Sequence, residues 1–126
     1  MDWKFRNDLP IYSQLVERIK QAIVSGAMPP GARLNSVRDL ATEAGVNPNT
    51  MQRALQELER EGLVYANRTA GRFVTEDIAR IQEARKALAA VQVRSFLEAM
   101  EKLGCDHEEI LALLAGEKEE KQDADL

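Results

Sequence analysis

The stretch GVNPNT at residues 45–50 decides the fold of this chain. Gly45 can take the left-handed conformation that ends a helix, and Asn47 can cap the helix that follows. Pro48 suits a first helical position, because no amide hydrogen is needed there. These residues therefore predict a tight turn between two helices.

The residues on both sides of this turn have helical periodicity. Residues 37–44 and residues 49–61 each place apolar side chains on one face at helical spacing, and Gly62 ends the second segment. Two helices joined by a short turn that contains glycine form a helix-turn-helix, whose second helix can enter a DNA major groove.

The flanking segments extend this unit in both directions. Apolar residues recur at helical spacing from Ile11 to Val24, and the turn MPPG follows at residues 28–31. Downstream, residues 63–67 and 72–75 have strand character, with a bend between them, and we expect Arg33 and Leu34 to pair briefly as a further strand. This order of elements predicts a winged helix, with the hairpin as the wing.

Residues 76–104 predict one long helix, because they contain strong helix formers and no proline. Its apolar residues form two stripes that one small chain cannot cover, so we expect a second copy of the chain to cover them. The alternative, that the helix folds back on its own chain, stays open. A short last helix is expected at residues 108–114. The residues expected at the dimer interface are Leu88, Val91, Phe96, Leu97, Met100, Leu103, Leu111 and Leu114.

Composition limits the classes of function. The 126 residues carry a net charge of −4, but residues 1–75 carry +2 and the remainder −6, so local basic patches on the first part are compatible with DNA binding. A single cysteine, Cys105, and a single histidine, His107, predict no disulfide and no metal site. We find no catalytic motif and no cofactor motif. Without a signal peptide or an apolar membrane span, the predicted location is cytoplasmic.

Four blocks together resemble the GntR family of bacterial transcription regulators: LPIYSQL at residues 9–15, PPGARL at 29–34, SVRDLA at 36–41 and GVNPNTMQRAL at 45–55. The resemblance spans about residues 10–74. The short C-terminal part resembles the YtrA-type subfamily, whose members dimerise through it and lack larger effector-binding domains. The resemblance thus implies a homodimeric repressor that binds a double-stranded, pseudo-palindromic operator. It neither indicates nor excludes a small-molecule effector.

The expected fold is mainly α with a small β-hairpin, a winged helix-turn-helix head followed by a two-helix C-terminal dimerisation region. We expect a DNA-binding domain at residues 1–75, the dimerisation region at 76–116 and an acidic flexible tail at 117–126. A winged helix that binds protein and not DNA is the alternative, because the fold serves both purposes.

Candidate DNA-contacting residues lie at the start of each helix of the motif and in the wing. Asn and Gln can pair with adenine, and Arg can read guanine or grip phosphate. For Arg38 an ion pair with Asp39 or Glu43 stays open, and for Asn47 a capping role alone. For Gln52 and Arg53 a solvated surface position or a pairing within the helix stays open. Thr69 replaces the first glycine of the family's wing, which shifts the expected specificity toward the recognition helix. The predicted DNA-contacting residues are Arg38, Asn47, Asn49, Thr50, Gln52, Arg53, Arg68, Gly71 and Arg72.

Overall fold

The computed structural model of the chain describes residues 1–124, with side chains described up to residue 120. The chain forms two compact units, Met1–Lys86 and Ala87–Leu126, here called the N-terminal unit and the C-terminal unit. Each unit is described separately. None of the helices in the described part of the chain is both long and apolar enough to cross a membrane.

The predicted turn joins helices α2 (Val37–Ala44) and α3 (Pro48–Arg60). Gly45 ends α2 in the left-handed conformation, with a φ of 69°. The Asn47 side-chain oxygen then accepts the backbone N–H of Asn49 at 2.7 Å and caps α3. At the other end of α2, the Ser36 hydroxyl accepts the backbone N–H of Asp39 at 3.1 Å. The helix-turn-helix is therefore built by the local signals that predicted it.

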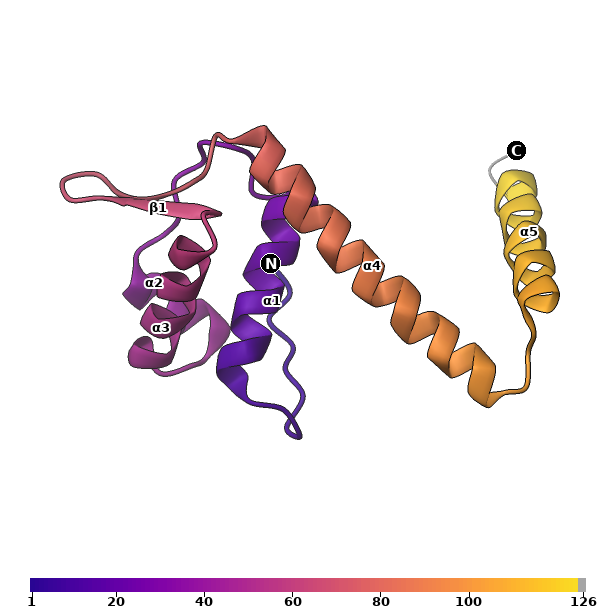
Figure 1. Cartoon of the computed structure of the whole chain (residues 1–126). Coiled ribbons are helices and arrows are strands. Elements are labelled where there is room, and N and C mark those ends of the chain that lie inside the picture. Colours follow the sequence, from indigo (N-terminus) through magenta and orange to yellow (C-terminus); the bar gives the residue numbers. More distant parts are fainter. Residues whose placement is uncertain (125–126) are drawn as a thin grey trace. The chain divides into compact units, whose positions relative to one another are not determined.

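Helix α1 (Ile11–Val24) and helix α2 both pack against α3 (Figure 1), so the second helix of the motif is held from two sides. Burying these apolar side chains is the main force that stabilises the unit, at roughly 25 cal/mol for each Å² removed from water. The largest fully buried side chains are Leu15, Ile19, Ile23, Met51, Leu55, Leu58, Leu63 and Val74.

The hairpin consists of β1 (Val64–Asn67) and β2 (Gly71–Val74), which pair antiparallel. Arg33 forms the expected third partner, through an antiparallel bridge to Phe73. The backbone N–H of Leu34 donates to the carbonyl of Arg72 at 2.9 Å, which fixes this short strand against β2. The wing is thus attached to the chain segment that leads into α2.

Helix α4 (Ile78–Lys102) begins inside the N-terminal unit, where Ile81 and Ala84 are buried. The Arg80 Nε donates to the backbone carbonyl of Glu61 at 2.7 Å, just after the end of α3. The N-terminal unit therefore includes the first turns of α4, about ten residues past the expected boundary at residue 75. The functional boundaries at residues 75 and 116 stay predictions.

Helix α5 (His107–Ala124) begins with a reciprocal cap: the Asp106 carboxylate accepts the N–H of Glu109, and the Glu109 carboxylate accepts the N–H of Asp106. The predicted end of this helix near Leu114 is wrong, because α5 continues to Ala124 through much of the expected tail. Glu, Lys and Gln are strong helix formers, and no proline follows that would end the helix. The last two residues of the predicted tail lie outside the described residues.

Candidate nucleic-acid interface

The first turns of α3 present polar side chains on a fixed scaffold. Asn49 and Arg53 are exposed and Thr50 and Gln52 are half-buried, whereas Met51 on the opposite face is fully buried. Because α1 and α2 hold the apolar face, the polar face cannot rotate inward. This arrangement suits a recognition helix, whose N-terminal residues meet base edges in a major groove.

Asn47 has a defined structural role at the start of α3. Its side-chain oxygen is engaged by the N–H of Asn49, while its amide nitrogen has no hydrogen-bond partner among the described residues. The residue therefore caps the helix with one atom and has two N–H groups left to donate to a ligand.

Arg38 lies in the first turn of α2 and is exposed. The alternative ion pairs with Asp39 and Glu43 do not form among the described residues, and the Glu43 carboxylate instead accepts the side-chain N–H of Asn35 at 2.9 Å. The backbone carbonyl of Arg38 accepts the Thr42 hydroxyl, and its guanidinium has no hydrogen-bond partner among the described residues.

Arg53 stacks on Tyr12, which is not among the predicted DNA-contacting residues. Its guanidinium carbon lies 4.2 Å from the centre of the Tyr12 ring, in the first turn of α1. Such a cation–π contact restrains a long side chain without removing its hydrogen-bond donors. The sequence block around Tyr12 carried the family resemblance, but nothing in its spacing pointed to Arg53.

The wing closes in a way that accommodates Thr69. The Asn67 side-chain oxygen accepts both the backbone N–H and the hydroxyl of Thr69, each at 3.0 Å. The only positive φ angle at the wing is that of Gly71, at 103°, so Thr69 needs no left-handed backbone. Arg68 at the tip is exposed.

Arg72, one of the predicted DNA-contacting residues, forms an ion pair within the protein. Its Nε lies 2.5 Å from the Glu59 carboxylate, and the two side chains are only 20% and 29% exposed. Glu59 belongs to α3, so this ion pair connects the wing to the recognition helix. Sequence spacing could not reveal the pair, because its members lie 13 residues apart on different elements.

The end of α3 carries a second ion pair, between Arg60 and Glu57. The Arg60 guanidinium lowers the pKa of the Glu57 carboxyl below its ordinary value, through the hydrogen bond and the charge attraction between them. This pair lies at the opposite end of α3 from Asn49 and Thr50.

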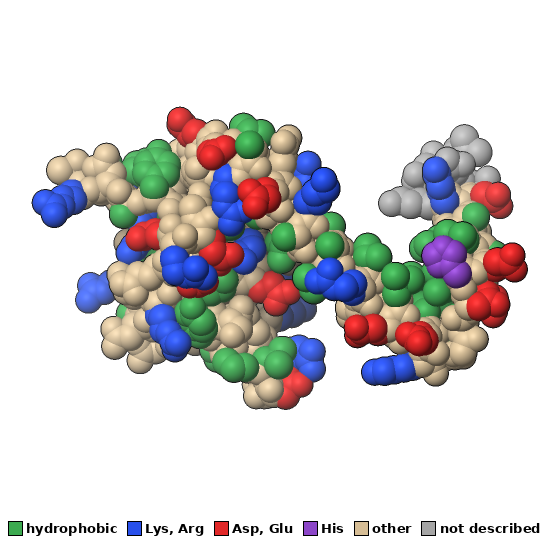
Figure 2. Space-filling view, in the orientation of Figure 1, with side chains coloured by type: hydrophobic (Ala, Val, Ile, Leu, Met, Phe, Trp, Pro, Cys, Tyr) green, Lys and Arg blue, Asp and Glu red, His purple; other side chains and the backbone are tan. Residues whose placement is uncertain are grey.

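Charge on the N-terminal unit is mixed. Figure 2 shows a basic side chain at the tip of the wing, and Lys and Arg side chains interspersed with Asp and Glu over the visible face of the unit. DNA binding by this unit would therefore depend on a few well-placed cations and not on a broad positive surface.

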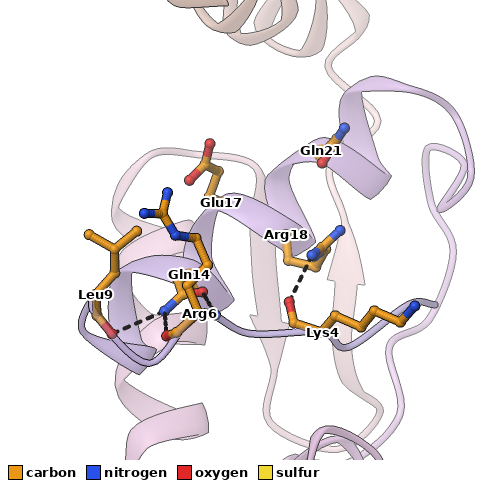
Figure 3. A pocket seen from close by; sticks show the side chains of 7 residues that line it. All are labelled: Lys4, Arg6, Leu9, Gln14, Glu17, Arg18 and Gln21. Carbon is orange, nitrogen blue, oxygen red and sulfur yellow. Dashed lines mark hydrogen bonds between the residues drawn. The ribbon is translucent and has the colours of Figure 1, made fainter.

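A pocket of about 300 Å³ lies elsewhere on the N-terminal unit, between residues 1–9 and helix α1 (Figure 3). The Gln14 amide donates to the carbonyls of Arg6 and Leu9, and Arg18 donates to the carbonyl of Lys4. These bonds explain how α1 holds the N-terminal segment. Trp3 and Phe5 of that segment are half-buried and pack together.

The C-terminal unit leaves most of its large apolar residues exposed. Leu103 is 75% exposed and Leu111 is 54% exposed, whereas Leu88 and Met100 are half-buried. Ile110, in the first turn of α5, is buried. The exposed members of the predicted set are Val91, Phe96, Leu97, Leu103, Leu111 and Leu114.

The model of the gntR family of bacterial regulatory proteins matches residues 11–74. These residues include the helix-turn-helix, the wing and every candidate DNA-contacting residue named above. Two curated proteins of Bacillus subtilis (strain 168) are similar to the chain. The uncharacterized HTH-type transcriptional regulator YhcF is 37% identical over 88% of this chain and 92% of its own length. The HTH-type transcriptional repressor YtrA is 43% identical over 57% of this chain and 55% of its own length.

Solved structures agree with these matches. A GntR family transcriptional regulator from Listeria monocytogenes superposes with a TM-score of 0.82 at 40% identity, covering 89% of this chain and 98% of that one. The DNA-binding domain of AraR, solved in complex with operator ORX1, has a TM-score of 0.53 at 28% identity, covering 57% of this chain and 93% of that one. The similarity thus includes a protein captured on operator DNA.

Proposed function

Because the chain belongs to the gntR family of bacterial regulatory proteins, whose members are DNA-binding transcriptional regulators and not enzymes, we propose that it is a homodimeric repressor. It binds a pseudo-palindromic operator in the cytoplasm and represses by covering it. The observation that carries the proposal is the fixed, exposed polar face of α3, with Arg38 beside it at the start of α2. The assignment as a repressor is supported by similarity to YtrA, which bears that description.

Each proposed DNA contact follows from a side chain that the fold leaves accessible. Asn49, Gln52 and Arg53 meet base edges in the major groove, and Thr50 holds a phosphate or a thymine methyl group. Arg38 grips phosphate or guanine, and Arg68 reaches DNA from the wing tip. Asn47 combines capping with contact. In place of the predicted DNA contact, we propose that Arg72 anchors the wing through Glu59.

Dimerisation is supported by the exposed apolar residues of the C-terminal unit. A surface of that kind is covered by another molecule in stable soluble proteins. A second copy of the chain fits best, since a two-fold symmetric interface presents the same residues from both sides. Two-fold symmetry then places the half-site centres about 34 Å apart, one helical turn of DNA, or a multiple of it.

Selection of duplexes from a random library by the purified full chain, followed by titration of the selected and a random duplex at two salt concentrations, tests the proposal. We expect the selected duplex to bind roughly 10³-fold or more tightly than the random one. The logarithm of the association constant should fall with the logarithm of salt concentration by about 0.9 for each phosphate neutralised. Equal affinity for both duplexes would overturn the proposal and favour a protein-binding winged helix.

Operator geometry provides a second measurement. Lengthening the centre of the selected site by half a helical turn rotates one half-site to the opposite face of the DNA, so we expect binding to weaken to that of one half-site. Lengthening the centre by a full helical turn returns both half-sites to the same face of the DNA, so binding should recover. Binding that ignores the spacing would remove the homodimer from the proposal.

A further inference from the structure

Arg33 lies in the short strand that precedes α2, on the face of the wing opposite Arg72. Its backbone pairs with Phe73, which places the two side chains on the same face of the small sheet. Tyr65 pairs with Phe73 on the neighbouring strand and stacks on it, with ring centres 5.5 Å apart. Since successive residues of a strand point to opposite faces, Arg72 lies on the other face, toward Glu59.

The guanidinium of Arg33 lies directly against Gly71. A Cβ atom placed on Gly71 would lie 3.3 Å from Nε and 3.6 Å from Nη2 of Arg33. The first of these contacts is tighter than ordinary van der Waals spacing and the second is ordinary, so the guanidinium lies close beside the Cα of Gly71. The positive φ of Gly71 independently favours glycine there.

Arg33 and Arg72 differ in burial and in whether their charge is paired with a carboxylate. Arg72 is paired and mostly covered, whereas Arg33 is exposed and has no side-chain hydrogen bond or ion pair among the described residues. The two faces of the small sheet therefore differ. One face carries Arg72 paired with Glu59, and the other carries the unpaired Arg33 beside Gly71, the first residue of β2.

We propose that Arg33 contacts a DNA phosphate beside the wing, a role that rests on the proposed function. Together with Arg68 at the tip, it gives the wing two available cations. A guanidinium binds phosphate through two parallel hydrogen bonds, and the strand pairing fixes the backbone from which the Arg33 side chain extends before DNA arrives. With a net charge of only +2 on residues 1–75, one further phosphate contact is a substantial share of the electrostatic attraction.

The experiment compares Arg33→Gln, Arg33→Lys and the control Arg60→Gln in the full-length chain. Arg60 is also an exposed arginine of the N-terminal unit, but its charge is paired with Glu57 at the far end of α3. Each protein is titrated with the selected duplex and with a random duplex over a series of salt concentrations, and its thermal unfolding is recorded.

Arg33→Gln should bind both duplexes roughly tenfold more weakly, as for the loss of one charged hydrogen-bonding group. Its salt dependence should become shallower by about 0.9 for each protomer that engages the DNA. Arg33→Lys should keep the salt dependence, because it keeps the charge, and Arg60→Gln should bind like the wild type.

Three results would overturn the assignment. An unchanged salt dependence in Arg33→Gln would show that no phosphate contact was lost. A loss confined to the selected duplex would assign Arg33 to base reading. A lowered unfolding temperature with unchanged binding would make the residue purely structural.

Failure of the proposed function is distinguishable from failure of this inference. If the wild type cannot tell the selected duplex from the random one, the proposed function fails. If the wild type discriminates and Arg33→Gln binds identically to it, only the role of Arg33 fails.

Discussion

The two units of this chain treat their apolar residues in opposite ways. The N-terminal unit buries most of the large apolar side chains of helices α1, α2 and α3 between these helices, whereas eight large apolar residues of the C-terminal unit are exposed and Ile110 alone is buried among its described side chains. Both units have ordinary helical sequences, so helix propensity does not explain the contrast. The N-terminal unit has a core of its own, whereas we propose that the C-terminal unit completes its core with the same residues of a second copy.

The largest expected effect tests whether that core belongs to the N-terminal unit alone. Leu55→Ala removes a fully buried side chain of α3 and should destabilise the unit by about 2–5 kcal/mol, through lost burial and the cavity left behind. The matched variant Leu113→Ala changes a residue that is 55% exposed and should leave the unit unaffected. Urea denaturation with amide hydrogen exchange of α3 measures both. Equal losses would contradict the contrast between the units.

The next largest effect tests whether a second copy of the chain covers the exposed apolar residues of the C-terminal unit, as we propose. Phe96→Glu places a charge within the exposed apolar surface of the C-terminal unit and should convert a dimer into monomers. Operator affinity should then fall by a factor on the order of 10², since the second half-site no longer benefits from a tethered partner. Sedimentation and duplex titration measure the two effects. A Phe96→Glu protein that remains dimeric would assign the interface to other residues.

Two substitutions test the proposed DNA contacts of the N-terminal unit without changing its buried core. Arg38→Ala and Gln52→Ala remove accessible side chains and should each weaken operator binding by about 1–3 kcal/mol, with an unchanged unfolding temperature. Titration with the selected duplex and with single-base variants of it shows which base pair each residue reads. Wild-type binding by both variants would remove them from the interface.

A smaller effect concerns the attachment of the wing. Glu59→Ala leaves Arg72 without its partner and should cost about 1 kcal/mol, which corresponds to roughly 4–8 °C in unfolding temperature for a unit of this size. The control Glu17→Ala removes an exposed carboxylate of α1 and should change the unfolding temperature little. A Glu59→Ala protein as stable as the control would mean that the ion pair contributes nothing to wing attachment.

The smallest effect is a pH dependence at the end of α3. Since Arg60 lowers the pKa of Glu57 in the folded protein, the pair contributes stability above the unfolded pKa of glutamate and loses it as pH falls through the lowered folded value. Comparing unfolding temperatures of the wild type and Glu57→Gln across this range should show curves that converge at acid pH. Parallel curves would remove the pair from the acid response of the N-terminal unit.

The sequence predicted those parts of the fold that depend on local signals. Gly45, Asn47 and Pro48 each act through their own backbone or the next turn of helix, so the helix-turn-helix could be placed almost to the residue. The predicted end of α5 was wrong because the sequence near Leu114 contains no proline that would end the helix. Without such a local signal, the end of a helix depends on small differences in helix propensity.

The arrangement of the candidate site depended on pairs that no local pattern encodes. Arg72 with Glu59 and Arg53 with Tyr12 are brought together only when separate elements pack. Residue type alone indicated that these arginines could bind DNA, but it could not show that one of them would be paired inside the protein. The electrostatic roles of arginines therefore had to come from the three-dimensional structure.

The N-terminal segment has a practical consequence. Trp3 is the only tryptophan of the chain, and both tyrosines, Tyr12 and Tyr65, also belong to the N-terminal unit. Trp3 is half-buried beside Phe5, in a segment that Gln14 and Arg18 hold against α1. Intrinsic fluorescence of the protein therefore reports on the N-terminal unit alone, and the C-terminal unit is optically silent apart from Phe96. The proposed duplex binding and the proposed dimerisation can accordingly be followed in one sample, with tryptophan emission reporting the first and an extrinsic dye on Cys105 reporting the second.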